Sequence, residues 1–170
     1  QYMAKLRDIH IFGNNFTGEI PDVIWSLPDL ESFVVGGNKF SGQLSDAIGN
    51  ATKLEWLDLG GNEIYGLIPE AIGELVSLDR LSIGVDSWSD YKLSGAVPSS
   101  IGNLVNLTDL NLEGNDLSSL PENIGDLASL KIMNFDANEL TEIPSSIGSL
   151  TNLTKLTLQA NQITEIPTTI

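Results

Sequence analysis

The chain has 170 residues, with 23 acidic against 8 basic side chains, a formal net charge of −15 and no cysteine. The acidic excess argues against a nucleic-acid partner, because phosphate binding needs clustered Lys and Arg. The lack of cysteine excludes disulfides, thiolate metal ligands and a cysteine nucleophile.

Apolar residues make up 41% of the chain, which is enough to form a buried core. No apolar run approaches the roughly 18 residues of a membrane-spanning helix, so we predict no direct membrane insertion by this segment. No charged-then-apolar leader precedes the first motif. We expect the chain to be a fragment that continues into further repeats at both ends.

One pattern, L-x-x-L-x-L-x-x-N, recurs throughout the sequence, and its clearest copy is LEWLDLGGN at Leu54–Asn62. Repetition at a near-constant period indicates a stacked repeat architecture. We therefore predict a single repeat domain over residues 1–170. Its copies begin at Leu6, Leu30, Leu54, Leu78, Leu107, Leu130 and Leu153.

Each copy has two halves with different periodicities. The alternation at Leu57, Asp58 and Leu59 predicts a short strand. The second half, from Ile68 to Leu78, has the apolar spacing of a short helical or 3-10 segment, and Pro69 suits its first turn. Neither half can bury its apolar side alone, so we expect stacked copies to form a parallel sheet over one continuous core.

These copies resemble leucine-rich repeats over essentially the whole chain. The first four resemble the plant-type subclass, L-x-G-x-I-P, and the last three a shorter subclass without the glycine. The plant-type segments are Phe16–Pro21, Phe40–Ser45, Ile64–Pro69 and Leu93–Pro98, and the shorter ones are Leu117–Pro121, Leu140–Pro144 and Ile163–Pro167. The resemblance implies an α/β repeat solenoid: a right-handed coil with a concave parallel β-sheet, short helical or 3-10 convex segments and a small second sheet on the flank of the plant-type copies.

The asparagine that ends each motif has a structural interpretation. Stacked side-chain amides can satisfy backbone groups that the turn leaves unpaired inside the coil. The predicted ladder comprises Asn14, Asn38, Asn62, Asn115, Asn138 and Asn161. Asp86 replaces asparagine in the fourth copy, and we expect the ladder to be weakest there. The glycines before the asparagine suit a tight bend, and these are Gly13, Gly37, Gly61 and Gly114.

The fourth copy also contains an insertion, residues 86–92, which carries Trp88 and Tyr91. Insertions in solenoids usually loop out at one edge. Three interpretations remain open: the aromatic pair packs onto a neighbouring repeat, it contacts a partner, or it is exposed without a role. The segment from Asp86 to Asp90 lacks the glycine and terminal glutamate of a dedicated calcium loop, so we predict no metal site and no cofactor.

By the same resemblance, side chains flanking the inward leucines project from the concave sheet. Their chemistry varies between copies, which suits recognition of a ligand. The predicted ligand-binding residues are Phe12, Val34, Trp56, Asp58, Arg80 and Asp109. Trp56 and Arg80 occupy equivalent positions in adjacent copies, which predicts a cation–π pair. Such a pair is either an anchor for a partner or two residues that only cover each other.

Catalysis has little support in the sequence. The single histidine, His10, has no cysteine to pair with, and Asp58 and Asp109 form a candidate carboxylate pair across the concave sheet. With so many acids, a pair at catalytic spacing is expected by chance, and an open sheet does not exclude water. We predict that the protein is not an enzyme.

The sequence thus favours a protein or peptide recognition module, part of the extracellular domain of a receptor-like or secreted protein. Binding is expected through the concave face and the insertion. Four sequons, at Asn15, Asn50, Asn106 and Asn152, agree with a glycoprotein in an extracellular or cell-surface location. The alternatives are a secreted inhibitor of a wall-degrading enzyme, similar to polygalacturonase inhibitors, and a structural scaffold in a larger assembly.

Overall fold

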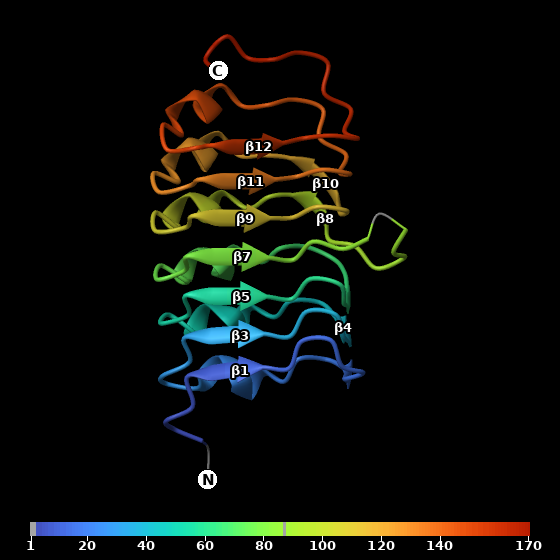
Figure 1. Ribbon diagram of the computed structural model, residues 1–170, viewed down its shortest axis with the longest axis vertical. Coiled ribbons are helices and arrows are strands. Elements are labelled where there is room, and N and C mark those ends of the chain that lie inside the picture. Colours follow the sequence, from blue (N-terminus) through green and yellow to red (C-terminus); the bar gives the residue numbers. More distant parts are fainter. Residues whose placement is uncertain (1–2, 87) are drawn as a thin grey trace.

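The computed structural model describes residues 3–86 and 88–170 and contains one parallel strand per copy, stacked into a single continuous sheet (Figure 1). The strands are β1 (Asp8–His10), β3 (Ser32–Val34), β5 (Trp56–Asp58), β7 (Arg80–Ser82), β9 (Asp109–Asn111), β11 (Ile132–Asn134) and β12 (Lys155–Thr157). Their register aligns equivalent motif positions, so that Trp56 lies beside Arg80 and Arg80 beside Asp109. The predicted parallel sheet is confirmed.

Short 3-10 helices return the chain on the other side of the coil. They are η1 (Asp22–Ser26), η2 (Asp46–Asn50), η3 (Glu70–Glu74), η4 (Ser99–Asn103), η5 (Glu122–Asp126) and η6 (Ser145–Ser149). A proline precedes five of them, where its missing N–H costs nothing. Ser45 takes this place before η2, and its side chain accepts a hydrogen bond from Ala47 N. Among the described residues, no helix has the length and apolarity to cross a membrane.

Two small sheets lie on the flank of the coil, and most of their strands lie at the beginnings of the plant-type segments. One contains β2 (Thr17–Gly18), β4 (Lys39–Gly42) and β6 (Glu63–Ile64), and the other contains β8 (Ser94–Ala96) and β10 (Asp116–Ser119). The division between them falls at the insertion, where a single bridge joins Gly66 to Leu93. The second sheet extends into the fifth copy, although that copy lacks the glycine, with an irregular register between Leu117 and Ser119.

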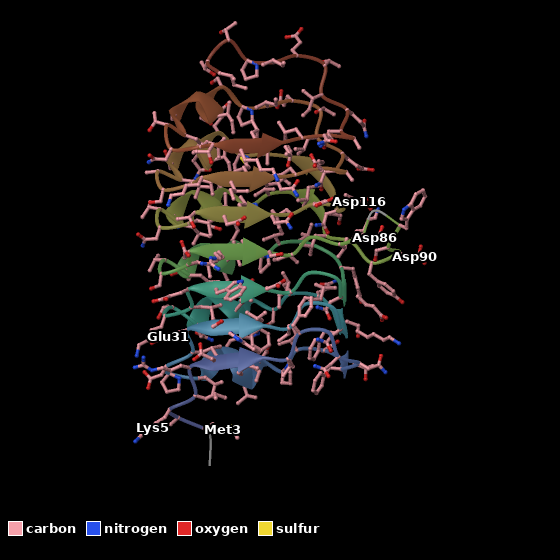
Figure 2. The ribbon with its side chains drawn as sticks, viewed as in Figure 1. Met3, Lys5, Glu31, Asp86, Asp90 and Asp116 are labelled. Atoms are coloured by element: carbon pink, nitrogen blue, oxygen red, sulfur yellow. The ribbon has the colours of Figure 1, made fainter. Side chains whose placement is uncertain are left out.

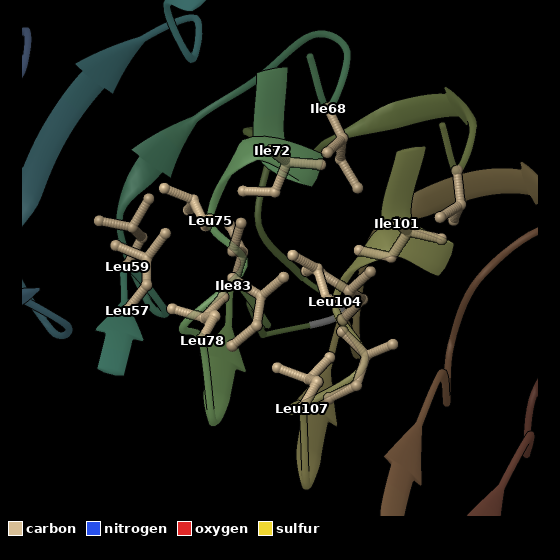
Figure 3. Close-up of a cluster of buried hydrophobic side chains, with 14 of the residues drawn as sticks. Leu57, Leu59, Ile68, Ile72, Leu75, Leu78, Ile83, Ile101, Leu104 and Leu107 are labelled. Carbon is tan, nitrogen blue, oxygen red and sulfur yellow. The ribbon is translucent and has the colours of Figure 1, made fainter. Parts of the chain in front are cut away.

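The core is a column of leucine and isoleucine side chains between the sheet and the 3-10 helices (Figure 3). Leu57 enters it from β5 and Leu59 from just beyond that strand, and Ile72 and Leu75 enter it from the return segment. All four are at most 1% exposed. Burying each such side chain contributes about 2 kcal/mol.

The asparagines form a hydrogen-bonded ladder along the turn that leaves each strand. Asn115 donates from Nδ2 to Leu112 O (3.0 Å) in its own copy and to Ile83 O (3.1 Å) in the preceding copy. Its Oδ1 accepts from Leu93 N at 2.9 Å. Asn38, Asn62, Asn138 and Asn161 repeat these contacts, whereas Asn14 is exposed and bonds within its own turn. One side chain therefore satisfies backbone groups in two adjacent copies.

Asp86 lies outside this ladder. Its side chain is exposed, and Oδ1 accepts a hydrogen bond from Trp88 N at 3.1 Å. The expectation of a weakened rung understates the change, because the carboxylate organises the insertion instead. Asn115 in the fifth copy still donates to Ile83 O of the fourth, as the other ladder asparagines donate to their preceding copies.

The predicted tight bends are confirmed, and they require left-handed backbone. Gly37 and Gly61, for example, have φ of 64° and 62°. In the last two copies Ala137 and Ala160 adopt the same conformation, each with φ 53°. A side chain in this region costs about 1 kcal/mol, so the stacking of neighbouring copies outweighs the local preference.

Asn115→Ala should lower the free energy of unfolding by about 2–4 kcal/mol, because it leaves the buried Leu93 N–H and two carbonyls without this partner. Urea denaturation would measure the loss. Asn14→Ala is the matched control, since Asn14 is exposed and bonds only Ile11 O and Phe12 O; its cost should stay below about 1 kcal/mol. Equal effects of the two substitutions would contradict a ladder that joins the copies.

Gly73→Ala should also destabilise the protein, by about 1–3 kcal/mol, because a Cβ at Gly73 would overlap the carbonyl oxygen of Ser100 in η4. Gly84→Ala on the concave side is the control. Its Cβ would approach only the Asn111 side chain at 3.2 Å and Glu113 O at 3.3 Å, and the asparagine can move. Thermal denaturation that ranks Gly84→Ala as the more damaging change would refute this account of helix stacking.

Candidate functional site

Trp56 and Arg80 form the predicted cation–π pair on the concave sheet. The Arg80 guanidinium carbon lies 5.1 Å from the centre of the Trp56 ring. Arg80 Nε also lies 3.3 Å from Asp79 Oδ2, in an ion pair whose side chains are both about half exposed. The guanidinium is thus held against the ring while it remains open to solvent, which is the form in which Trp and Arg anchor binding partners.

His10 extends this cluster across a strand. Its ring packs edge-on against Trp56 with centroids 5.7 Å apart, although β1 and β5 are separated by β3. The two rings therefore meet above β3, and His10 Nε2 lies 2.6 Å from Ser32 Oγ. Ser32 and Val34 lie beneath them and are each only 7% exposed. Val34 therefore offers little surface in the free protein, and its contact with a ligand stays a prediction.

Asp58 and Asp109 do not form a carboxylate pair. They lie on β5 and β9 with β7 between them, which places their strands about 10 Å apart. Asp58 Oδ1 accepts a hydrogen bond from Gly60 N at 3.0 Å. Burial raises the pKa of Asp109; Arg80 and Lys155 oppose this shift and Asp79 reinforces it.

Glycines occupy the edge of the concave face that adjoins the flank sheets. Gly36, Gly60 and Gly84 occupy equivalent positions in successive copies. Phe12, at the same position in the first copy, is 66% exposed, and its ring is close to Gly37. Gly60 and Gly84 are partly exposed, whereas Gly36 is buried, with the Asp58 carboxylate 3.0 Å from the point where its Cβ would lie.

The insertion projects from the flank-side edge of the sheet, between β7 and β8 (Figure 1). Trp88 is 88% exposed and Tyr91 is 42% exposed. The interpretation in which this aromatic pair packs onto a neighbouring repeat is therefore wrong for Trp88. The polar side chains of the loop bond its own backbone: Asp86 accepts from Trp88 N, and Ser89 Oγ both accepts from Tyr91 N and donates to Tyr91 O, each at 3.1 Å.

The surroundings of the insertion are acidic. Asp86, Asp90 and Asp116 lie together at this edge (Figure 2). Lys92 is beside them, with Nζ 3.1 Å from Asp116 Oδ1. Among residues 3–86 and 88–170, no group of three or more His, Asp or Glu side chains is arranged to hold a metal ion.

The four sequon asparagines are exposed but differ in their contacts. Asn106 and Asn152 donate from Nδ2 to Val76 O (2.9 Å) and Ala128 O (2.8 Å) of the preceding copies. Asn50 lies at the end of η2, and Asn15 lies in the turn before β2. Glycosylation of these sites remains a prediction.

Asp109→Asn should stabilise the protein more at pH 7 than at pH 3. A raised pKa in the folded state means that ionisation of Asp109 opposes folding; the favourable contribution of the protonated form is lost as the pH rises through the folded-state pKa. The difference in Tm between variant and wild type should therefore grow as the pH rises above the ordinary value of 3.8. Asp126→Asn, at an exposed site on η5, is the control. A Tm difference that stays constant with pH would count against buried charge at Asp109.

Comparison with protein families matches two leucine-rich-repeat models to the chain. The leucine-rich repeat region model covers residues 86–170, and a second leucine-rich-repeat model covers residues 5–27 and 53–75. No curated protein matches the chain.

Solved structures with the same architecture include plant receptor proteins. The Arabidopsis receptor kinase HAESA, in complex with the peptide hormone IDA and the co-receptor SERK1, is 31% identical with a TM-score of 0.85, over 94% of this chain and 26% of that one. The Arabidopsis BIR3–SERK2 complex gives 31% identity and a TM-score of 0.69, over 80% and 70% of the two chains. A Leptospira interrogans leucine-rich-repeat protein is 26% identical with a TM-score of 0.64, over 96% of this chain and 45% of that one.

The chain thus spans about a quarter of the HAESA ectodomain. The family matches agree with the repeated motif, the parallel sheet and the 3-10 return segments, all of which are features of a leucine-rich-repeat coil. The protein belongs to the leucine-rich-repeat family and has the solenoid fold of a recognition module.

Proposed function

We propose that this chain is part of the extracellular recognition domain of a receptor-like or secreted protein. It binds a protein or peptide ligand through the concave face and the insertion loop, residues 86–92. Binding depends on surface complementarity, and the chain performs no bond chemistry on its ligand. The residues proposed to contact the ligand are Phe12, Trp56, Asp58, Arg80, Asp109, Trp88 and Tyr91.

The observation that carries this proposal is the solvent-open Trp56–Arg80 stack at the centre of a variable surface. Leucines at the inward positions repeat from copy to copy, whereas the outward positions at this register are Ser32, Trp56, Arg80 and Asp109. The core alone would tolerate small polar residues at all of them. A large aromatic ring with a stacked cation is the kind of residue pair that dominates binding energy in protein interfaces.

The arrangement supports recognition better than catalysis. His10 is engaged with Ser32 and Trp56, and the two candidate carboxylates are separated by a strand. The sheet face is broad and open to solvent, so it offers little of the water exclusion that favours chemistry on a bound substrate.

The similar solved structures support both the kind of ligand and the location. The HAESA structure is described as a receptor kinase with a peptide hormone and a co-receptor, and GASSHO1/SCHENGEN3 as the ectodomain of a plant membrane receptor kinase. We extend from these a peptide or protein ligand and an extracellular or cell-surface location. The exposed sequons at Asn15 and Asn50 agree with that location.

Trp56→Ala combined with Arg80→Ala should weaken ligand binding at least about tenfold, because the pair supplies the main concave anchor. The probe would be peptides selected on the wild-type chain from a displayed library of random 12-residue sequences, with Kd measured by calorimetry. The double variant should lose at most about 2 kcal/mol of stability, since both side chains remain partly exposed.

Val76→Ala combined with Val105→Ala provides a control with two exposed side chains far from the concave positions. The control should leave Kd unchanged. Undiminished binding by the Trp56/Arg80 variant, or a large loss of stability with intact binding, would show that the pair is structural and would refute the proposed site.

A further inference from the structure

A low path crosses the concave face from the Trp56–Arg80 pair to the insertion loop. The outward positions that follow Arg80 along β7 are Ser82 and Gly84, and Gly60 lies beside Gly84 on the preceding copy. We call the surface over Gly60, Ser82 and Gly84 the corridor. An extended chain lying in the corridor would meet backbone and the Ser82 hydroxyl, with the Asp58 carboxylate beside Gly60 and the Asn111 amide beside Gly84.

The corridor has a defined length. The backbone stays extended beyond β7, as shown by the hydrogen bond from Val85 N to Glu113 O at 2.8 Å. From Arg80 to Asp86 it advances about 20 Å at roughly 3.3 Å per residue. An extended peptide of about six residues therefore spans the distance from the first aromatic anchor to the loop that carries the second.

The two ends of the corridor are both built to present an aromatic ring. Trp56 is fixed on one side by Arg80 and on the other by His10. The backbone N of Trp88 donates to Asp86, and its ring is 88% exposed. The Trp56 ring is therefore ordered before binding and loses little entropy there, while Trp88 offers an exposed apolar surface.

Charge defines the chemistry of the occupant. Acidic side chains border the corridor and the loop, and these are Asp58, Asp86, Asp90, Glu113 and Asp116. The two bases at this surface already have acidic neighbours: Arg80 pairs with Asp79 at 3.3 Å, and Lys92 with Asp116 at 3.1 Å. The remaining carboxylates favour a positively charged partner, and Lys or Arg side chains can also stack on Trp88.

We infer that the corridor holds one extended, positively charged peptide segment that runs along β7 and contacts Trp56 at one end and Trp88 at the other. This inference rests on the proposed recognition function and adds the direction, the span and the charge of the ligand. The segment lies across the stacking direction of the copies, so its specificity depends mainly on the third and fourth copies.

Peptides selected from the random 12-residue library on the wild-type chain should be enriched in Lys and Arg. Trp56→Ala and Trp88→Ala should each weaken the binding of the same selected peptides at least about tenfold. Asp86→Asn combined with Asp90→Asn should also weaken peptide binding. The loss of affinity relative to wild type should be larger at low salt than at high salt, because salt screens the attraction between the carboxylates and the peptide.

Filling the corridor provides an independent test. Gly84→Leu places a side chain in the path and should abolish most binding; its Cβ would lie 3.2 Å from the movable Asn111 side chain and 3.3 Å from Glu113 O, without overlap of backbone atoms. Gln159→Leu is the matched control, because Gln159 occupies the equivalent exposed position in the seventh copy. Tm measurements on both variants would confirm that each is folded.

The outcomes separate this inference from the function on which it rests. Binding that requires Trp56 but survives Trp88→Ala and Gly84→Leu overturns the corridor while the concave recognition site stands. Binding that is indifferent to both tryptophans, or no enriched peptide at all, overturns both. Selected peptides without net positive charge also overturn the inference.

Discussion

Each copy of this protein can bury its leucines and satisfy its turn only against the next copy. A strand of three residues, such as β5 (Trp56–Asp58), cannot fold alone, and Leu57 is buried because other copies lie on both sides of it. The same dependence governs the polar groups, since the Asn115 side chain bonds carbonyls of two successive copies. Stacking at the spacing of a parallel sheet is the constraint from which the rest of the structure follows.

This constraint separates the residues that build the coil from those that are free to vary. Inward positions of the core carry apolar side chains, and most glycines of the 3-10 segments have no room for a Cβ, as Gly73 shows against Ser100. Outward positions of the sheet carry no such demand, so Trp56 and Arg80 can occupy sites where other copies have serine or aspartate. The scaffold thus holds a variable surface in a fixed geometry, which is a general basis for recognition.

The insertion shows how the coil accommodates an interruption. Asp86 leaves the asparagine ladder and bonds within the loop instead, while Asn115 of the next copy makes the same contact to its preceding copy as the other ladder asparagines. The small flank sheet divides there, yet the main sheet continues from β7 to β9 without a break. A local change in chemistry therefore alters one edge and leaves the core intact.

The sequence by itself determined the family, the positions of the strands and returns, the inward leucines, the asparagine ladder and the Trp56–Arg80 stack. All of these follow from residue spacing, because a fixed period places equivalent residues side by side. Only the tertiary structure decided that Val34 is covered, that Trp88 projects into solvent, and that His10 meets Trp56 across an intervening strand. Those outcomes depend on the size and direction of side chains from different copies. The repeat spacing predicts which residues are adjacent on the sheet, but it does not predict which side chain covers its neighbour.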